Sequence, residues 1–384
     1  MRGDNQGDRF PDTRTNQLTQ HEARGLPNQA LRRAFGVQNA FTTDNAPAAN
    51  EFVRHVRGLI TTSAVDSTGL SRTLSSMLLN MDWALTDIHR GVRRRRVPLA
   101  PLVRALALKA SLTMLFKTRE GIDLENKRLS DLGNIIHKSW MDMKSAREEV
   151  MEFKDNSILK ERLSAVFGKH EVEAFVKDPQ SNPLNLILPS FETLWRIVLR
   201  LFLVILNQDD YHQALLDFVQ TPTPTQFKLA LGQDGISAEL LVKEALRLYP
   251  PTRRIRRAYQ FADDDSITTV AADIEACQLD KNVWGADALQ FNPARWRKGS
   301  ASDAESRKFL AFGSRPFLCP ASNEFGSMMI GLLAGILLGV VTGRTGPEWV
   351  LGSDSATDME ELHTGKRLRN DRDAYERVFL ELTG

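Results

Sequence analysis

Apolar residues recur at helical spacing over most of the chain, and this pattern predicts a protein built mainly from α-helices. Residues 253–272 predict short β-strands, so the expected fold class is mainly α with small β-sheets. Residues 1–26 are predicted to be disordered from their polar composition, and residues 27–384 to form a single domain. The predicted helices cover residues 27–63 with a break near 44–49, 70–89, 99–116, 131–153, 157–175, 186–206 and 238–249.

One further segment, residues 328–341, is apolar throughout and contains three glycines. It is 14 residues long, shorter than the roughly 20 residues that a helix needs to cross a bilayer. We therefore predict a buried helix here rather than a membrane span. No signal peptide or membrane anchor is readable in the polar first 50 residues, so membrane association is not expected to be encoded in this chain.

The composition is that of an ordinary globular protein, with 42% hydrophobic and 26% charged residues. The formal net charge is +2, too balanced to predict binding to nucleic acid from bulk charge. Two cysteines among 384 residues exclude a disulfide framework and favour a reducing compartment.

One of these cysteines, Cys319, lies in a loop with the sequence Phe-Gly-Ser-Arg-Pro-Phe-Leu-Cys-Pro-Ala, directly before the apolar segment 328–341. Backbone N–H groups in such a loop and the start of the following helix both favour an anionic sulfur. The pattern suits a thiolate that binds a metal, although a buried structural cysteine is the commoner fate of a free cysteine.

Three other motifs precede this loop in a fixed order. Glu192 and Thr193 form an acid–alcohol pair in a predicted apolar helix, and Glu244 and Arg247 share one helical face because they are three residues apart. A third motif, Asn-Pro-Ala-Arg-Trp, contains Arg295. Glu244 lies as far after Thr193 as Arg295 lies after Glu244.

In this order and spacing the four motifs resemble the cytochrome P450 family, the haem-thiolate monooxygenases. The residues around the motifs are similar to those of the fungal secondary-metabolism branch. The resemblance implies a cytochrome P450-like fold with haem b as cofactor and Cys319 as the iron ligand. The glycines of segment 328–341 would let that helix approach the porphyrin closely. Eukaryotic members carry an N-terminal anchor, so we expect the anchor and the first β region to be missing.

The resemblance also assigns roles to the charged residues. Glu244, Arg247 and Arg295 would form a buried structural charge network beneath the haem. Glu192 and Thr193 would deliver protons during oxygen activation; the alternative is that Glu192 is only an acidic residue in the first turn of a helix.

The cysteine loop departs from the family pattern Phe-x-x-Gly-x-Arg-x-Cys-x-Gly. Phe312 matches its first position, but Phe317 stands where an arginine normally pairs with a haem propionate. We expect Arg315 to supply that charge from a reshaped loop. Arg256 is the first choice for a second propionate contact, with the adjacent Arg257 also at a fitting distance from Arg247.

The helix with the acid–alcohol pair departs as well, because Pro189 and Ser190 replace two small residues. A proline there removes a helix hydrogen bond, so we predict a break or a helix start at this point.

The activity implied by the resemblance is oxidation of an apolar small molecule, such as a natural product, with O2 and two electrons. The expected donor is an NADPH-dependent diflavin reductase, and the family implies association with the endoplasmic reticulum, although this chain reads as soluble and cytoplasmic. Two alternatives stay open: a haem-thiolate peroxygenase, isomerase or dehydratase, and a shortened non-catalytic paralogue with impaired haem binding.

Overall fold

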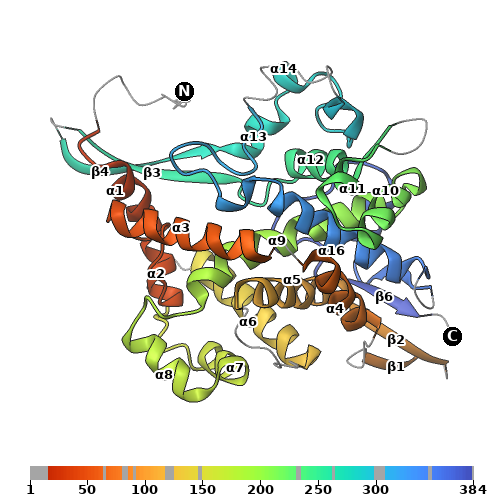
Figure 1. The fold of residues 1–384 in the computed structure, drawn as a ribbon, viewed down its shortest axis with the longest axis horizontal. Coiled ribbons are helices and arrows are strands. Elements are labelled where there is room, and N and C mark those ends of the chain that lie inside the picture. Colours follow the sequence, from red (N-terminus) through yellow and green to blue (C-terminus); the bar gives the residue numbers. More distant parts are fainter. Residues whose placement is uncertain are drawn as a thin grey trace, which may run out of the picture.

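A computed structural model describes most of the chain and shows a mainly helical protein with two small sheets (Figure 1). The described residues are 16–63, 66–79, 85–89, 92–116, 125–145, 149–230, 235–261, 264–297, 308–344 and 348–382. The α-helices of the N-terminal half are α1 (Gln20–Gly25), α2 (Gln29–Phe35), α3 (Ala46–Ser63), α4 (Ser67–Leu79), α5 (Leu99–Leu115), α6 (Asn126–Ser145), α7 (Ser157–Phe167) and α8 (Lys169–Lys177). Those of the C-terminal half are α9 (Leu184–Ile205), α10 (Asp209–Gln220), α11 (Pro224–Lys228), α12 (Ala238–Leu248), α13 (Ile274–Leu279), α14 (Lys281–Trp284), α16 (Phe325–Val341) and α17 (Ala356–His363).

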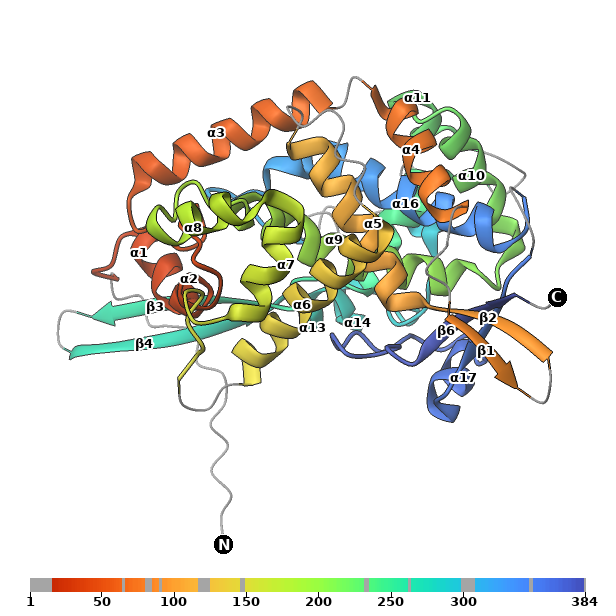
Figure 2. The ribbon, with the colours of Figure 1, turned by 90° about the horizontal axis from the view of Figure 1, so that it is seen from below.

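Three apolar helices, α5, α9 and α16, form the centre of the core (Figure 2). α9 packs against both of the others and against α12, and nearly all of its side chains are buried. A helix that is apolar over most of its surface must be covered on most of its surface, which explains its central place. Among the described residues no helix is long and apolar enough to span a membrane, and α16 is a buried core helix as predicted.

The glycines of α16 face other helices and not an open space. A Cβ at Gly335 would come within 2.6 Å of the Val219 side chain and 2.9 Å of the Leu215 carbonyl, both on α10. Gly331 and Gly339 also face neighbouring helices. The expectation that these glycines approach a porphyrin is therefore wrong: their spacing of four residues makes a groove for close packing of α10.

α9 continues through Pro189, where we expected a break or a start. Proline lacks the N–H that would bind the carbonyl of Asn185, four residues earlier. That carbonyl instead accepts a hydrogen bond of 3.1 Å from the side-chain amide of Asn39. A residue distant in sequence thus replaces the lost donor and keeps the helix intact.

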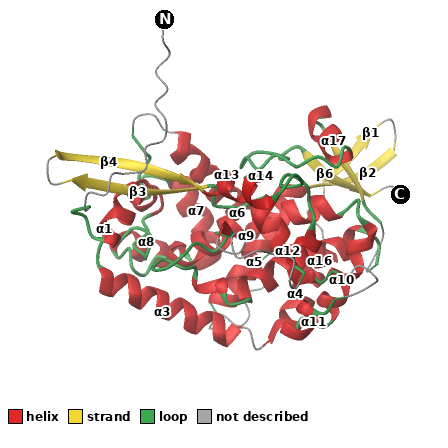
Figure 3. Cartoon of the chain, turned by 90° about the horizontal axis from the view of Figure 1, so that it is seen from above, coloured by secondary structure: helices red, strands yellow, loops and turns green. Residues whose placement is uncertain are grey.

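The two sheets lie at opposite ends of the molecule (Figure 3). The four-stranded sheet has the order β1-β2-β6-β5, and β3 pairs with β4 as an antiparallel ribbon. The strands are β1 (Leu85–His89), β2 (Val92–Pro98), β3 (Arg254–Phe261), β4 (Asp264–Asp273), β5 (Val350–Ser353) and β6 (Val378–Leu382). The ribbon confirms the strands predicted for residues 253–272.

Other local predictions also differ from the structure. The predicted helix 131–153 corresponds to α6, which ends at Ser145, and residues 149–153 are not helical. The predicted helix 70–89 ends at Leu79, and residues 85–89 form β1. The predicted helix 157–175 is two helices that meet at Gly168, whose φ of 94° a residue with a side chain rarely adopts. Residues 20–25 form α1 within the segment predicted to be disordered, because Thr19 and Glu22 make a capping box; residues 1–15 lie outside the described part.

Candidate functional site

Cys319 lies in a closed loop directly before α16. Its backbone N–H donates to the carbonyl of Phe312 at 2.9 Å, and Gly313 takes a φ of 72° to make the turn. The Phe312 ring lies close to the backbone of Gly326, where a Cβ would come within 2.9 Å of it. Phe312 and Gly326 together fix the loop to the first turn of α16.

The thiol of Cys319 is free, and the residue is half-buried. Burial raises its pKa, while a hydrogen bond from the Ala321 N–H and the nearby positive charge of Arg24 oppose that rise. The protein therefore offers the sulfur one backbone donor and one cation, which are the groups that stabilise a thiolate once a metal binds it.

The structure brings Glu244, Arg247 and Arg295 together as the sequence predicted. Both nitrogens of the Arg247 fork bind the carboxylate of Glu244, at 2.9 and 2.7 Å, and Arg295 Nε adds a third bond at 3.1 Å. Trp296 Nε1 and the backbone N–H of Asn292 complete the set at 2.9 and 3.0 Å. Glu244 and Arg247 have no exposed side-chain surface, so the pair is tolerated because its polar atoms are bonded.

This charge network is connected to the cysteine loop through Gln278 on α13. The Gln278 amide donates to the carbonyls of Leu246 and Arg247 on α12, and its oxygen accepts the N–H of Leu310 at 2.8 Å. Trp296 also packs edge-on against Phe309, with ring centroids 5.0 Å apart. The network thus holds the segment that leads to Cys319.

The acid–alcohol pair lies on two different faces of α9. Within residues 184–203 only Leu186, Pro189, Ser190 and Thr193 keep partial exposure, and their spacing makes one stripe along the helix. The Thr193 hydroxyl donates to the carbonyl of Pro189 at 3.1 Å. Thr193 is therefore on the incompletely covered face of α9, whereas Glu192 points into the protein.

Glu192 is 1% exposed and binds Arg372 at 2.5 Å through one oxygen. Its other oxygen is buried and has no hydrogen-bond partner among the described residues, and the same is true of His137 Nδ1 and the indole nitrogens of Trp140 and Trp195. Burial, followed by the charges of Arg104, Arg372 and Arg196, lowers the pKa of His137 to about 3. Glu192 thus sits in a polar cluster whose hydrogen bonds are incomplete.

The two arginines predicted to contact propionates both have exposed side chains. Arg256 is exposed on β3, and its neighbour Arg257 lies 5.2 Å above the Phe317 ring, because successive residues of a strand point to opposite sides. Arg315 is exposed within the cysteine loop itself. Propionate binding by Arg256 and Arg315 stays a prediction, and Arg257 is the arginine of this strand that lies against the loop.

The residues around Cys319 fit a flat, apolar cofactor with anionic groups. Cys319 supplies a sulfur donor, and Arg24 and Arg257 supply cations beside it. Apolar side chains of α3, which packs against the turn after Cys319, and of the loop and early α16 stay partly exposed. They are Phe52, Val56, Leu59, Phe312, Phe325 and Met328.

Sequence reasoning missed Arg24, Arg372, Gln278 and Asn39. Trp296 and Gln278 lie inside or next to recognised motifs. Trp296 could have been found as a donor to Glu244, and Gln278 as an acceptor for the N–H of Leu310 before the loop. Arg24 and Arg372 carry no local signal, because each acts on a residue far away in the sequence.

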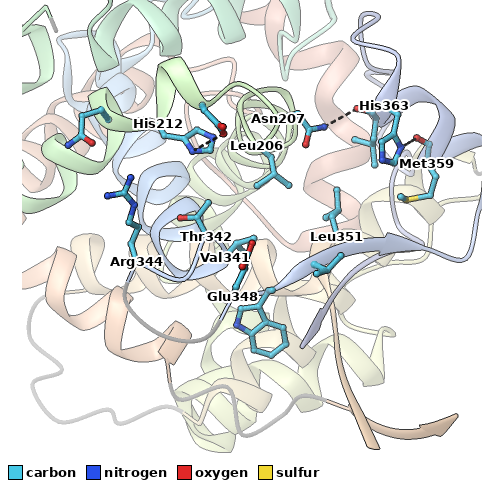
Figure 4. Close-up of a pocket in the computed structure, with 15 residues that line it drawn as sticks. Leu206, Asn207, His212, Val341, Thr342, Arg344, Glu348, Leu351, Met359 and His363 are labelled. Carbon is cyan, nitrogen blue, oxygen red and sulfur yellow. Dashed lines mark hydrogen bonds and ion pairs between the residues drawn. The ribbon is translucent and has the colours of Figure 1, made fainter. Parts of the chain in front are cut away.

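A cavity of about 630 Å³ lies elsewhere, at the far end of α16 (Figure 4). Val341, Thr342 and Arg344 line it together with His212 and His363. Because α16 has 17 residues, its two ends are roughly 25 Å apart. This cavity is therefore separate from Cys319, which precedes the other end of the helix.

Residues 238–338, which contain the Glu244 network and Cys319, match the family model of cytochrome P450. Cytochrome P450 734A2 of Oryza sativa subsp. japonica is 34% identical over 119 residues, which are 29% of this chain and 21% of that protein. Cytochrome P450 72A397 of Kalopanax septemlobus is 24% identical over 267 residues, 64% of this chain and 49% of that protein. The chain thus spans at most about half the length of these curated relatives.

Solved structures share the fold. Cytochrome P450 OleT in complex with arachidonic acid has a TM-score of 0.55 at 11% identity, over 95% of this chain and 85% of that one. CYP175A1 from Thermus thermophillus has a TM-score of 0.52 at 16% identity, over 84% and 77%. These two structures show the cytochrome P450 fold.

Residues 238–338 are thus similar to the cytochrome P450 family, and the chain shares the fold of the solved cytochrome P450 structures. The fold class predicted from the sequence is confirmed, and the family-model match supports the predicted family over residues 238–338. The relatives named above are plant proteins and give no support to the fungal branch.

Proposed function

We propose that the protein binds haem b through the Cys319 thiolate and oxidises an apolar small molecule with O2 and two electrons. The observation that carries this proposal is the fixed position of Cys319. Its sulfur accepts a hydrogen bond from the Ala321 N–H, and Gln278 connects its loop to the buried Glu244 network. A structural cysteine would not need a dedicated loop of this kind.

When bound, the haem would supply oxygen chemistry in which one oxygen atom enters the substrate and the other leaves as water, consuming two electrons and two protons. The residues of this chain have three tasks. Cys319 donates electron density through its sulfur, and Glu244, Arg247 and Arg295 keep the loop in place. Thr193, on the incompletely covered face of α9, is placed to orient water and pass protons.

Glu192 is the source of those protons in this proposal. Its carboxylate must leave Arg372 or exchange a proton beside it before it can serve Thr193, since the two side chains lie on different faces of α9. The oxygen of Glu192 that lacks a partner is the group free to accept a proton or a water.

The electron donor that fits this proposal is an NADPH-dependent diflavin reductase at the endoplasmic reticulum. The substrate would be an apolar natural product, because the partly exposed side chains around the cysteine loop are mainly apolar. Both assignments rest on the family resemblance.

A second function, a haem-thiolate peroxygenase, isomerase or dehydratase, is favoured by one observation. Pro189 and Ser190 replace the usual small pair, and Glu192 is held by Arg372 on the buried side of α9. A protein that took its oxygen from peroxide, or catalysed no oxygen insertion, would not need proton delivery by this pair.

The test of the proposed function is the absorption spectrum of the purified protein, reduced under carbon monoxide. Wild type should show the Soret position diagnostic of thiolate ligation, Cys319→Ala should lose it, and Cys277→Ala should keep it. Absence of haem from wild type would instead support the shortened, non-catalytic paralogue. A thiolate spectrum in Cys319→Ala would show that another ligand is used.

A further inference from the structure

A buried polar cluster lies on the covered side of α9. Its members are His137 and Trp140 of α6 and Glu192 and Trp195 of α9, and we call them the α6–α9 cluster. The rings of His137 and Trp195 meet edge-on, with centroids 5.0 Å apart. Arg372 links the other two members, because it binds Glu192 and lies 4.5 Å above the Trp140 ring.

Each member of the cluster carries a buried polar atom that has no hydrogen-bond partner among the described residues. These atoms are His137 Nδ1, Trp140 Nε1, Glu192 Oε1 and Trp195 Nε1. The side chains are deeply placed, with exposures of 8% for His137 and 1% for both Glu192 and Trp195. Because nearly all buried polar atoms in native proteins are hydrogen-bonded, four exceptions in one cluster indicate a bound water, an ion or a chemical role.

The two indoles of the cluster are the clearest exceptions. Arg196 and Arg200 on α9 also have one unpartnered nitrogen each, but both donate to backbone carbonyls through other nitrogens. An indole has a single polar atom, so Trp140 and Trp195 make no side-chain hydrogen bond within the described part of the chain. Trp284 is different, because its Nε1 donates to a backbone carbonyl at 3.2 Å.

The four unpartnered atoms are two donors and two acceptors. Indole nitrogens only donate, and an ionised carboxylate only accepts. His137 Nε2 lies 3.7 Å from a carboxylate oxygen of Glu376, so Nε2 carries the proton of the neutral ring and Nδ1 accepts. The ring is neutral because burial, followed by the charges of Arg104, Arg372 and Arg196, lowers its pKa to about 3.

A water molecule is the ligand that matches this set. It accepts and donates hydrogen bonds, and buried waters typically make two to four of them to polar groups that are otherwise unsatisfied. An anion could accept from the two indoles, but it would lie against the Glu192 carboxylate and the lone pair of His137 Nδ1. A cation would meet two N–H donors and the arginines around the cluster.

We propose that the α6–α9 cluster binds one internal water molecule, which accepts from the two indoles and donates to Glu192 and His137. His137, Trp140 and Trp195 are then positioning residues, because they act on the Glu192 carboxylate through this water. The water site needs no haem, but its use rests on the proposed function. Each proton that Glu192 passes on is regained from this water, and exchange with solvent restores the water.

The first test compares two buried tryptophans in the full chain. Trp195→Phe removes the N–H that binds the water, and the matched control Trp284→Phe removes one that binds a carbonyl. The two residues are 1% and 2% exposed, and each has an arginine over its ring, Arg104 at 5.1 Å and Arg247 at 5.2 Å. Urea denaturation should therefore show that both variants raise the unfolding equilibrium constant by similar factors.

The opposite outcome has a distinct sign. If no water satisfied the Trp195 indole, its removal would relieve an unpaired buried donor, and Trp195→Phe would be about 10-fold less unfolded at equilibrium than Trp284→Phe. That result would overturn the site. Trp140→Phe is the second variant should Trp195→Phe fail to fold. A crystal structure should show an ordered water within hydrogen-bond distance of Glu192 Oε1 and His137 Nδ1, and direct bonds between cluster members in its place would also overturn the site.

A second test addresses the use of the water. His137→Phe removes one acceptor and should lower product formed per NADPH by about 10-fold, because one hydrogen bond to the water is lost. His137→Asn keeps an acceptor oxygen near the position of Nδ1 and should restore most of this coupling, and equal losses in the two variants would overturn the positioning role. A wild type without haem would contradict the proposed function, whereas the tryptophan comparison would still decide the water site.

Discussion

Two buried glutamates of this protein have opposite surroundings. Glu244 is fully buried and accepts five hydrogen bonds, from Arg247, Arg295, Trp296 and the backbone of Asn292. Glu192, which is 1% exposed, binds Arg372, and in the part of the chain that the structure describes its other oxygen has no hydrogen-bond partner. Both were recognised from motifs, but the motifs do not reveal this difference.

This difference distinguishes a carboxylate with a structural role from one that is suited to proton exchange. A carboxylate with every lone pair in use is fixed, because any movement breaks several bonds at once. A buried carboxylate with a vacant oxygen is costly to keep, and such incomplete sites concentrate where chemistry occurs. Glu244 therefore belongs to the scaffold, and in the proposed function Glu192 is the carboxylate that takes part in proton transfer.

The largest effect is expected from breaking the Glu244 network. Arg247→Ala leaves the charge of Glu244 buried with fewer donors and should cost about 3–5 kcal/mol of unfolding free energy. Urea denaturation of the purified protein, or its soluble yield, measures this loss. Arg256→Ala, on an exposed arginine, should change stability by less than about 0.5 kcal/mol. If the two variants were equally stable, Glu244 would not be the scaffold residue described here.

The second prediction concerns proton delivery. Thr193→Ala and Glu192→Gln should preserve substrate binding and reduction but lower product formed per NADPH by on the order of 10²-fold, with hydrogen peroxide released instead. Product yield and NADPH consumption, measured in the same reaction, give the coupling, and added peroxide should partly restore product. Full coupling in Thr193→Ala would contradict the relay and favour the peroxygenase, isomerase or dehydratase.

A third, smaller effect should show whether removing the charge of Arg372 compensates for the loss of the Glu192 carboxylate. Replacing Glu192 and Arg372 together with leucine removes both charges, and such apolar replacements of a buried ion pair are often neutral or stabilising. The double variant should unfold within about 1.5 kcal/mol of wild type, whereas Glu192→Leu alone should be clearly less stable. A double variant as unstable as Glu192→Leu would mean that Glu192 has structural partners beyond Arg372.

The fourth and smallest effect is a pH dependence of the cluster around Glu192. The folded-state pKa of His137 is about 3, below the unfolded value of about 6.5, so the unfolded chain binds the proton first. The contribution of His137 to stability is therefore complete above pH 6.5 and is lost as the pH falls towards 3. His137→Gln should reduce the slope of unfolding free energy against pH in this window by up to about 1.4 kcal/mol per unit.

Arg104, Arg196 and Arg372 face His137, and Glu376 lies 3.7 Å from its Nε2. The matched control for this slope is His55→Gln, because His55 is exposed on α3. An equal change of slope in both variants would show that burial of His137 does not set its protonation.

How far the sequence predicts this molecule depends on how local each interaction is. Glu244 and Arg247 are three residues apart on one helix, so their pairing follows from helix geometry alone. The position of Cys319 before an apolar helix is equally local. Interactions with distant partners carry no such signal: the side of β3 on which Arg256 or Arg257 lies depends on how the strand pairs and packs, and Arg24 acts on a loop formed by the other end of the chain.

The helical prediction failed for a similar reason at residues 85–89. That segment pairs with β2, and β2 in turn pairs with β6 near the C-terminus. Strand formation there depends on a partner strand far away, which hydrophobic periodicity does not detect.

The bond between Asn39 and the Asn185 carbonyl has a consequence for how this sequence could have changed over time. Pro189 is tolerated in the centre of α9 only while Asn39 provides the missing donor. Asn39 had to be present before the proline or arrive with it, and reverting Asn39 alone would now be harmful. The two positions are therefore epistatic, and a homologue with proline at the matching helix position should retain a side-chain donor opposite it.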